Sequence, residues 1–305
     1  MDLRKIQYFF AVVEHGNLSS AARALRVSQP TLSRQIQAIE EQFQTPLFLR
    51  GGGRGMLLTD AGRQLHEGLQ SIERRLRSLK DDVAAVSVEP SGEVAFGIPP
   101  SPRGLIAVPL IKSFNKAYPR VVIRIIEETS AQLRDLVASG MIDVAITNTL
   151  EPGHGVSAQA LGRERMLLIG APGAKLSMRK ETPIQALEGL PLILTTRPNS
   201  LRLTIETGLG EYGLQPNVRF EANTLPLMTD LVIAGLGYTV LPACGARSLL
   251  KSGQVTASPL TGFFITWLVA RPKTRSLSVA AERFYDGLWT IAARQVRDGI
   301  WQPAA

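Results

Sequence analysis

The stretch 17–43 constrains the fold of this chain more than any other segment. It reads NLSSAARALRVSQPTLSRQIQAIEEQF, which predicts an Ala-rich helix over 19–25, a tight turn at 26–27 and a second helix after Ser28. Ser28 has the side chain of a good N-cap, and Pro30 suits the first helical turn, where a missing N–H costs nothing. Two short helices joined by so brief a turn are typical of a helix-turn-helix.

The second helix of this pair is predicted to be amphipathic, like a preceding helix over 3–15 that ends at Gly16. Its apolar residues recur at helical spacings, at Leu32, Ile36, Ile39 and Phe43. The N-terminal end of its outer face is rich in hydrogen-bonding groups and carries no acids. The residues on or beside this face are Ser28, Gln29, Pro30, Thr31, Ser33, Arg34 and Gln37. Such a surface fits the major groove of DNA, whose base edges offer donors and acceptors. Periodicity alone is equally compatible with a solvated face on an ordinary helical domain.

A small hairpin is predicted directly after the helix-turn-helix. The stretch PLFLRGGGRGMLL indicates two short apolar strands around a Gly-rich turn that carries Arg50 and Arg54. A wing of this kind beside a recognition helix typically touches phosphate or the minor groove, where arginine is favoured. We therefore count Arg50 and Arg54 among the candidate DNA-binding residues, with a mere surface loop as the alternative.

A long helix is predicted beyond Thr59, which is a plausible N-cap. Its apolar residues follow an unbroken heptad pattern, at Leu65, Leu69, Ile72, Leu76, Leu79, Val83 and Val86. Charges of both signs occupy the other faces, so the helix is solvated except along one narrow stripe. A second long helix is the partner that fits such a stripe best. The alternative is that the stripe packs on this chain's own domains.

After a break at 89–91, apolar strands alternate with helical patterns, as expected of a parallel α/β sheet. The first set of strands reads VAFGI, VVIRII and DVAIT, with helices over 110–118 and 132–139. The second set reads MLLIGA, LILTT, VRFEA and GYTVLP, with helices near 201–212 and 225–235. Two similar α/β subdomains are the simplest interpretation.

Small polar residues follow the predicted strands, where ligands bind in open α/β sheets. The candidates are Pro100, Ser101, Thr129, Ser130, Asn148, Arg197, Asn199, Ser200, Arg202 and Thr224. Hydroxyl groups beside helix N-termini receive carboxylates well, and Arg197 or Arg202 would add positive charge. The site is therefore predicted to bind a small anionic molecule. Each residue taken alone is also explained as a helix N-cap.

Length and composition limit which classes of protein remain possible. At 305 residues, two or three folding units are expected, and no apolar run approaches the roughly 20 residues that span a bilayer. The N-terminus lacks the apolar core of a secretory signal, so we expect a cytoplasmic location. The single cysteine, Cys244, allows no internal disulfide and is interpreted as a core thiol rather than a redox sensor. The three histidines are scattered, so no metal site and no cofactor are predicted.

Net charge does not locate the DNA-binding part. The chain carries +8, but residues 1–90 hold 12 basic and 10 acidic side chains, whereas residues 91–305 hold 22 and 16. The placement of individual residues must therefore carry the assignment.

Three segments together, AARALRVSQPTLSRQIQAIEEQF, PLFLR and LLTDAG, resemble the N-terminal signature of LysR-type transcriptional regulators. The likeness covers about the first 65 residues, and the triple glycine at 51–53 departs from the more varied polar residues of the family. It implies a winged helix-turn-helix over 1–59, a dimerisation helix over 60–89 and an effector-binding domain over 90–305. That domain would resemble periplasmic solute-binding proteins, with subdomain I at about 90–161 and 268–305, and subdomain II at about 162–267.

The resemblance also implies partners. These are double-stranded DNA, a small-molecule effector, a second copy in a homodimer, a homotetramer, and RNA polymerase.

Two rival functions rest on the C-terminal domain alone. An enzyme is one, although the chain has no nucleophile elbow, P-loop, metal-ligand spacing or dinucleotide fingerprint. A solute-binding protein for transport is the other, and both the missing export signal and the helix-turn-helix argue against it.

Overall fold

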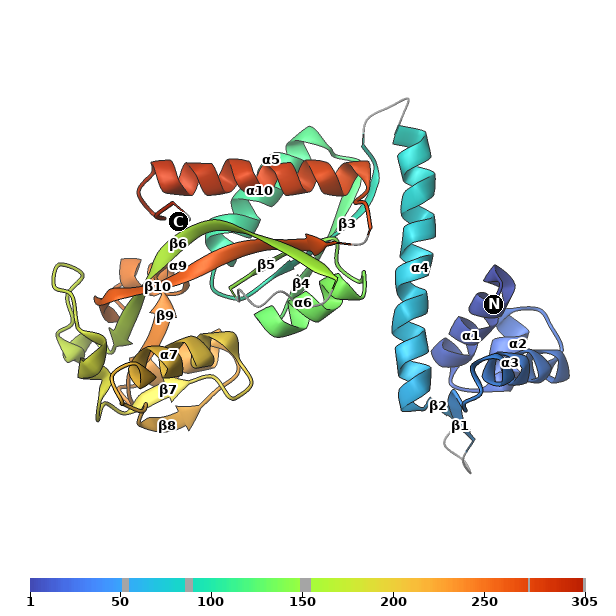
Figure 1. Ribbon diagram of the computed structural model, residues 1–305, viewed down its shortest axis with the longest axis horizontal. Coiled ribbons are helices and arrows are strands. Elements are labelled where there is room, and N and C mark those ends of the chain that lie inside the picture. Colours follow the sequence, from blue (N-terminus) through green and yellow to red (C-terminus); the bar gives the residue numbers. More distant parts are fainter. Residues whose placement is uncertain (51–54, 86–89, 149–154, 274, 304–305) are drawn as a thin grey trace. The chain divides into compact units, whose positions relative to one another are not determined.

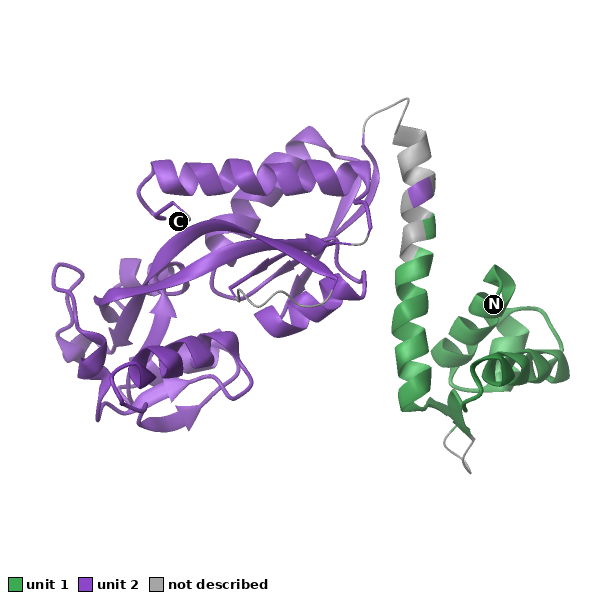
Figure 2. Ribbon diagram, in the orientation of Figure 1, with its two compact units in different colours: residues 1–77 green, residues 78–305 purple. Residues whose placement is uncertain are grey.

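The computed structural model describes residues 1–50, 55–85, 90–148, 155–273 and 275–303. The chain divides into two compact units, unit 1 at residues 1–77 and unit 2 at residues 78–305 (Figure 2). Figure 1 labels the helices and strands of each unit.

Unit 1 is a three-helix domain with a small hairpin. Its elements are α1 (Leu3–His15), α2 (Leu18–Ala24), α3 (Gln29–Phe43), β1 (Phe48–Arg50) and β2 (Met56–Leu58). Short-range chemistry sets the helix bounds, because Asn17 caps α2 and Ser28 caps α3 through their side-chain oxygens. Gly16 ends α1 with a φ of 67°, a conformation that favours glycine. The helices enclose a core that includes Phe9, Leu32 and Ile36.

The hairpin is tied to α3 by an acid. One carboxylate oxygen of Glu40 accepts hydrogen bonds from the backbone N–H groups of Leu47 at 2.8 Å and Phe48 at 3.2 Å. Gly62 allows the chain to pass close behind the hairpin, since a Cβ there would lie 2.1 Å from the Leu47 carbonyl oxygen. The position of the wing is therefore fixed by contacts inside unit 1.

The long helix α4 (Asp60–Ala85) begins after Thr59, whose hydroxyl accepts from the Gly62 N–H at 2.9 Å. Its apolar stripe has two parts. Leu69 is only 4% exposed and belongs to the core of unit 1, whereas Ile72 and Leu76 are 49% and 38% exposed. Packing on the chain's own domain, which was the alternative interpretation, holds for the beginning of the stripe. The side chain of Val83 and all of Val86 lie outside the described part of the chain.

Beyond the end of α4, unit 2 contains β3 (Gly92–Ile98), a π-helical turn η1 (Arg103–Ala107), α5 (Val108–Ala117), β4 (Val121–Glu127), α6 (Ser130–Ala138) and β5 (Val144–Thr147). It continues through β6 (Val156–Gly170), the short turns η2 (Pro172–Ala174) and η3 (Ile184–Leu187), β7 (Leu192–Leu194), α7 (Ser200–Gly210), β8 (Val218–Glu221), α8 (Leu225–Ile233) and β9 (Thr239–Pro242). The last elements are α9 (Ala243–Lys251), β10 (Thr256–Pro272) and α10 (Val279–Arg297).

The main sheet of unit 2 is mixed, so the prediction of a parallel sheet was wrong. Its strand order is β4-β3-β5-β10-β6-β9, and β7 pairs with β8 separately. Strand β3 is parallel to both neighbours, but β10 is antiparallel to β5 and β6, and β9 is antiparallel to β6. The chain crosses between the subdomains on one long strand and returns on another, which makes this pair antiparallel.

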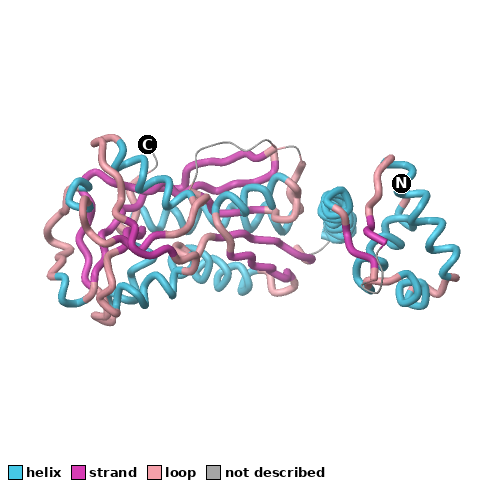
Figure 3. Tube along the Cα trace, turned by 90° about the horizontal axis from the view of Figure 1, so that it is seen from below, coloured by secondary structure: helices cyan, strands magenta, loops and turns pink. Residues whose placement is uncertain are grey.

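The two long strands β6 and β10 run through both subdomains. Gly162 and Trp267, the predicted bounds of subdomain II, are partners in their register. In subdomain I, helix α10 contacts β3 and α5, while α6 contacts β5 and β10 from the other face (Figure 1). In Figure 3 the strands of unit 2 run along its length with helices beside them. This framework places the carboxyl ends of β3, β4, β7 and β8 around one pocket.

Candidate functional site

The N-terminal half of α3 is a polar surface held on a rigid base. Leu32, Ile36 and Ile39 are buried in the core of unit 1, and this fixes the rotation of the helix. Ser33 is half-buried. The other predicted residues are exposed, and these are Ser28, Gln29, Pro30, Thr31, Arg34 and Gln37. The Ser28 hydroxyl accepts from the Thr31 N–H and lies 2.7 Å from the Thr31 hydroxyl, so both belong to the cap as well. The two wing arginines cannot be placed, because Arg54 and the side chain of Arg50 lie outside the described residues.

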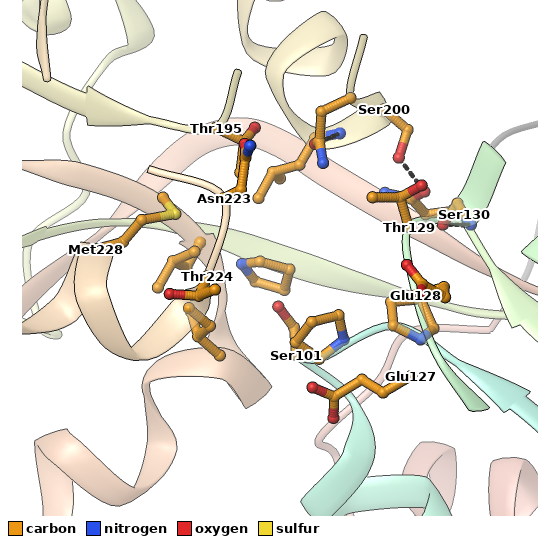
Figure 4. Close-up of a pocket in the computed structure, with 18 of the residues that line it drawn as sticks. Ser101, Glu127, Glu128, Thr129, Ser130, Thr195, Ser200, Asn223, Thr224 and Met228 are labelled. Atoms are coloured by element: carbon orange, nitrogen blue, oxygen red, sulfur yellow. Dashed lines mark hydrogen bonds between the residues drawn. The ribbon is translucent and has the colours of Figure 1, made fainter. Parts of the chain in front are cut away.

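Unit 2 contains a pocket of about 300 Å³ between its subdomains (Figure 4). Eight of the ten predicted ligand residues line it: Pro100, Ser101, Thr129, Ser130, Asn148, Asn199, Ser200 and Thr224. Sequence reasoning missed two acids, Glu127 and Glu128, and several residues of the far wall and floor, among them Thr195, Met228, Ile265 and Trp267. These residues were predicted because ligands of open α/β sheets bind just beyond the carboxyl ends of strands, which we call the strand-end rule. Each residue found follows a strand or begins a helix.

The subdomain I wall is acidic. Glu127 ends β4 and lies 3.5 Å from Arg103, with both side chains about half exposed. Glu128 follows, is exposed, and has no ion pair with any residue that the structure describes. Thr129 caps α6 in a capping box with Gln132, so its hydroxyl is already used. The two acids stand directly before a threonine that the strand-end rule had selected, and extending that rule by two residues would have found them.

The subdomain II wall presents hydrogen-bond donors. The side-chain oxygen of Asn199 accepts from the backbone N–H groups of Leu201 and Arg202, at 2.9 and 3.3 Å. The side-chain oxygen of Asn223 accepts from the backbone N–H of Thr196 at 3.1 Å. These fixed donors orient both amides, so each NH₂ group points away from its backbone partner. Thr224 occupies the N-cap position of α8, but its side chain makes no capping hydrogen bond.

Thr195 adds a buried hydroxyl to the same wall. The residue is 9% exposed, and its hydroxyl has no hydrogen-bond partner among the described residues. Buried polar groups are almost always paired in folded proteins, so an unpaired one in a pocket wall is a candidate contact for a ligand.

A hydrogen bond joins the two subdomains at the pocket. The Ser200 hydroxyl, at the start of α7, donates to the side-chain oxygen of Asn148 at 2.6 Å (Figure 4). The backbone N–H of Asn148 in turn donates to the Ser130 hydroxyl at 3.2 Å. These three predicted residues therefore meet each other in the structure.

Arg197 and Arg202 do not line the pocket, and the prediction that they supply its positive charge was wrong. Glu206 engages both, with the Arg197 guanidinium at 2.8 Å and a hydrogen bond from Arg202 Nε. Burial opposes the ionisation of Glu206, but these two bonds outweigh it and lower its pKa. Arg202 is buried and also donates to the Thr195 carbonyl oxygen at 3.1 Å. Glu206 lies four residues after Arg202, which is a common spacing for ion pairs in helices, so this pairing could have been predicted from the sequence.

The floor of the pocket rests on a buried acid. Trp267 Nε1 donates to one carboxylate oxygen of Glu164 at 2.7 Å, and the backbone N–H of Cys244 donates to the other at 2.7 Å. Burial raises the pKa of Glu164, and these hydrogen bonds only partly offset the effect. Burial and the Glu164 carboxylate also raise the pKa of the Cys244 thiol well above its ordinary value. Such a thiol is a weak nucleophile, and Cys244 is only partly buried against the core of unit 2.

No helix in the described part of the chain is long and apolar enough to cross a membrane. Among the same residues, no group of three or more His, Cys, Asp and Glu side chains is arranged to hold a metal ion.

A winged helix-turn-helix joined to a two-lobed α/β unit with a polar pocket defines a DNA-binding regulator with an effector-binding domain. Two family models match the chain: bacterial regulatory helix-turn-helix protein, lysR family, at residues 3–63, and LysR substrate binding domain, at residues 87–290. The second alone covers more than half of the chain. The chain therefore belongs to the LysR family of transcriptional regulators, and its function is regulation of transcription rather than solute transport.

Known relatives resemble the chain over nearly its full length. The nitrogen assimilation regulatory protein nac of Escherichia coli (strain K12) is 30% identical over 304 residues, which cover 98% of this chain and 97% of that protein. The DNA-binding transcriptional dual regulator OxyR of the same organism is 28% identical over 85% of each chain. Full-length CbnR, solved in complex with its target DNA, shares the fold with a TM-score of 0.71 at 21% identity, covering 95% of this chain and 100% of that one.

Proposed function

We propose that α3 reads a DNA sequence in the major groove and that the wing contacts the adjacent backbone. The observation that carries this proposal is the division of α3 into a buried apolar side and an exposed polar end without acids. Arg34 is exposed there and has no ion pair among the described residues, so its five donors are available for phosphate or a guanine edge. The solved complex of CbnR with its target DNA supports the same role for this fold.

The exposed part of the α4 stripe supports a homodimer. Ile72, Leu76 and Leu79 are large apolar side chains at heptad spacing on the surface of one helix. Pairing with a second copy would cover them and place two copies of α3 on symmetric half-sites. A homotetramer and a contact with RNA polymerase follow from family membership.

The pocket is the proposed effector site. A ligand that contacts both subdomains binds one relative placement of them more tightly than another, and this differential affinity is what couples ligand binding to DNA binding. The chain needs no catalytic step for this role, and we place it in the cytoplasm with the DNA that it reads.

A duplex selected from a random-sequence library tests the DNA-binding role. The parent protein is expected to enrich one sequence family, and Arg34→Ala is expected to weaken binding to the enriched duplex by about tenfold or more in fluorescence anisotropy, because a good arginine contact contributes about 1–3 kcal/mol. Arg247→Ala is the matched control, since it removes the same exposed charge from unit 2. Failure of the parent to enrich any sequence would contradict the proposal.

A further inference from the structure

The two walls of the pocket have opposite hydrogen-bonding character. Figure 4 shows the acidic wall, with Glu127 and Glu128, on one side and the donor wall, with Asn223 and Thr224, on the other. No lysine or arginine lines the pocket in the described part of the chain. A ligand must satisfy both walls, so its two ends must differ in charge.

The donor wall selects an acceptor. The amide oxygens of Asn199 and Asn223 are both occupied by backbone N–H groups, which leaves only the NH₂ groups to face a ligand. The Thr224 hydroxyl makes no hydrogen bond in its own helix cap, and it precedes the first N–H groups of α8. Asn199 at the start of α7 and Asn223 with Thr224 at the start of α8 therefore offer donors at two helix N-termini that line one pocket, and such donors match a carboxylate. The unpartnered, nine-tenths buried hydroxyl of Thr195 lies in the same wall and independently indicates that a polar ligand group belongs there.

The acidic wall selects a cation. Arg103 partly neutralises Glu127, but the Glu128 carboxylate has no ion pair with a described residue. A second anion placed beside it would be repelled, whereas an ammonium group would be attracted. A purely anionic ligand therefore satisfies only one of the two walls.

Resting on the proposed effector role of this pocket, we propose that the effector is a small zwitterion of the ω-amino acid type. Its ammonium group faces Glu128 and Glu127, and its carboxylate faces Asn199, Asn223 and Thr224. The methylene chain between them lies over the apolar floor that Trp267 and Met228 provide. The proposed ligand keeps the carboxylate that was expected from the sequence, but its net charge is zero rather than negative.

Four probes of matched chain length test the proposal on the full-length protein: ε-aminocaproate, adipate, hexylamine and hexanoate. Binding is followed by tryptophan fluorescence, because Trp267 lines the pocket. We expect ε-aminocaproate to bind at least tenfold more tightly than each of the other three, since each of those leaves one wall unsatisfied. Glu128→Gln should weaken ε-aminocaproate about tenfold and should leave hexanoate unchanged or tighter.

Glu211→Gln is the control for loss of one negative charge. Glu211 lies just beyond the C-terminal end of α7, about 16 Å along the helix from the pocket, and should not change probe binding. Adipate or hexanoate binding as tightly as ε-aminocaproate would overturn the zwitterion, as would an unaltered affinity in Glu128→Gln or no binding of ε-aminocaproate at millimolar concentration. If adipate binds and changes DNA retention, the proposed function stands and only the ligand class fails. Absence of DNA binding by the parent would instead remove the regulator role and leave the probe affinities as they are.

Discussion

Replacement of Thr195 by valine is expected to make the chain more stable and less able to bind its effector. The Thr195 hydroxyl is buried and unpaired among the described residues, and such a group costs about 1–3 kcal/mol. Valine keeps nearly the same shape without that cost. Taking the lower end, unit 2 should gain about 1 kcal/mol, which raises its unfolding temperature by about 2–4 °C for a domain of this size.

The chain supplies both the assay and the control. Its three tryptophans, Trp267, Trp289 and Trp301, all lie in unit 2, so tryptophan emission during urea unfolding reports on that unit within the intact protein. Thr239 is fully buried, is likewise unpaired among the described residues, and is absent from the pocket wall. Thr239→Val should therefore raise stability by a similar amount and leave ligand affinity alone.

Binding separates the two variants. Loss of one hydrogen bond to the ligand's carboxylate should weaken ε-aminocaproate about tenfold or more in Thr195→Val, because a hydrogen bond to a charged group contributes about 1.5–3 kcal/mol. Thr195→Ser keeps the hydroxyl and should keep most of the affinity. A destabilisation of about 1 kcal/mol or more in Thr195→Val would refute the reasoning, since it would mean that the hydroxyl is well paired in the folded protein.

Three further outcomes are expected. Ile72→Glu combined with Leu76→Glu should convert dimers to monomers in analytical ultracentrifugation; Leu69 is left intact because its burial in unit 1 would make any charge there unfold the domain, and dimers of unchanged mass would contradict the α4 pairing. The raised pKa of Glu164 means that the folded state holds its proton more tightly than the unfolded state, so the urea stability of unit 2 should fall as the pH rises above about 4.5. Glu164→Gln should remove that part of the pH slope, and an unchanged slope would show that Glu164 does not cause it. Glu40→Ala should speed amide hydrogen exchange at Leu47 and Phe48 by about tenfold, because both N–H groups lose their acceptor, whereas equal exchange rates would show that this acid does not hold the wing.

The helix-turn-helix was predictable because short-range chemistry determines it. The N-caps Asn17 and Ser28 and the left-handed Gly16 act within three or four residues of themselves, so their effect can be read from neighbouring letters. The strand-end rule also transfers well, since it needs only the place where an apolar run stops. Eight pocket residues were found in this way.

The pairing of strands that are far apart in the chain could not be predicted from the sequence. Strand β10 pairs with residues about a hundred positions earlier, and nothing local in its sequence specifies that partner or its antiparallel direction. Glu164 stood just before the predicted strand MLLIGA and drew no prediction, because its partners Trp267 and Cys244 are far away in the chain. Arg202 was misassigned for the opposite reason, since its partner Glu206 lies only one helical turn away and was overlooked.

The hydrogen bond from Ser200 to Asn148 affects the sensitivity of the sensor, and the pocket walls affect its selectivity. Any opening of the pocket on this side must break it, and a bond of about 1 kcal/mol shifts the balance between closed and open arrangements by about fivefold. A ligand of modest affinity is enough to move so shallow a balance. The walls decide which molecule is recognised, whereas this single bond sets how much of that molecule is needed for a response, so selectivity and sensitivity can change independently.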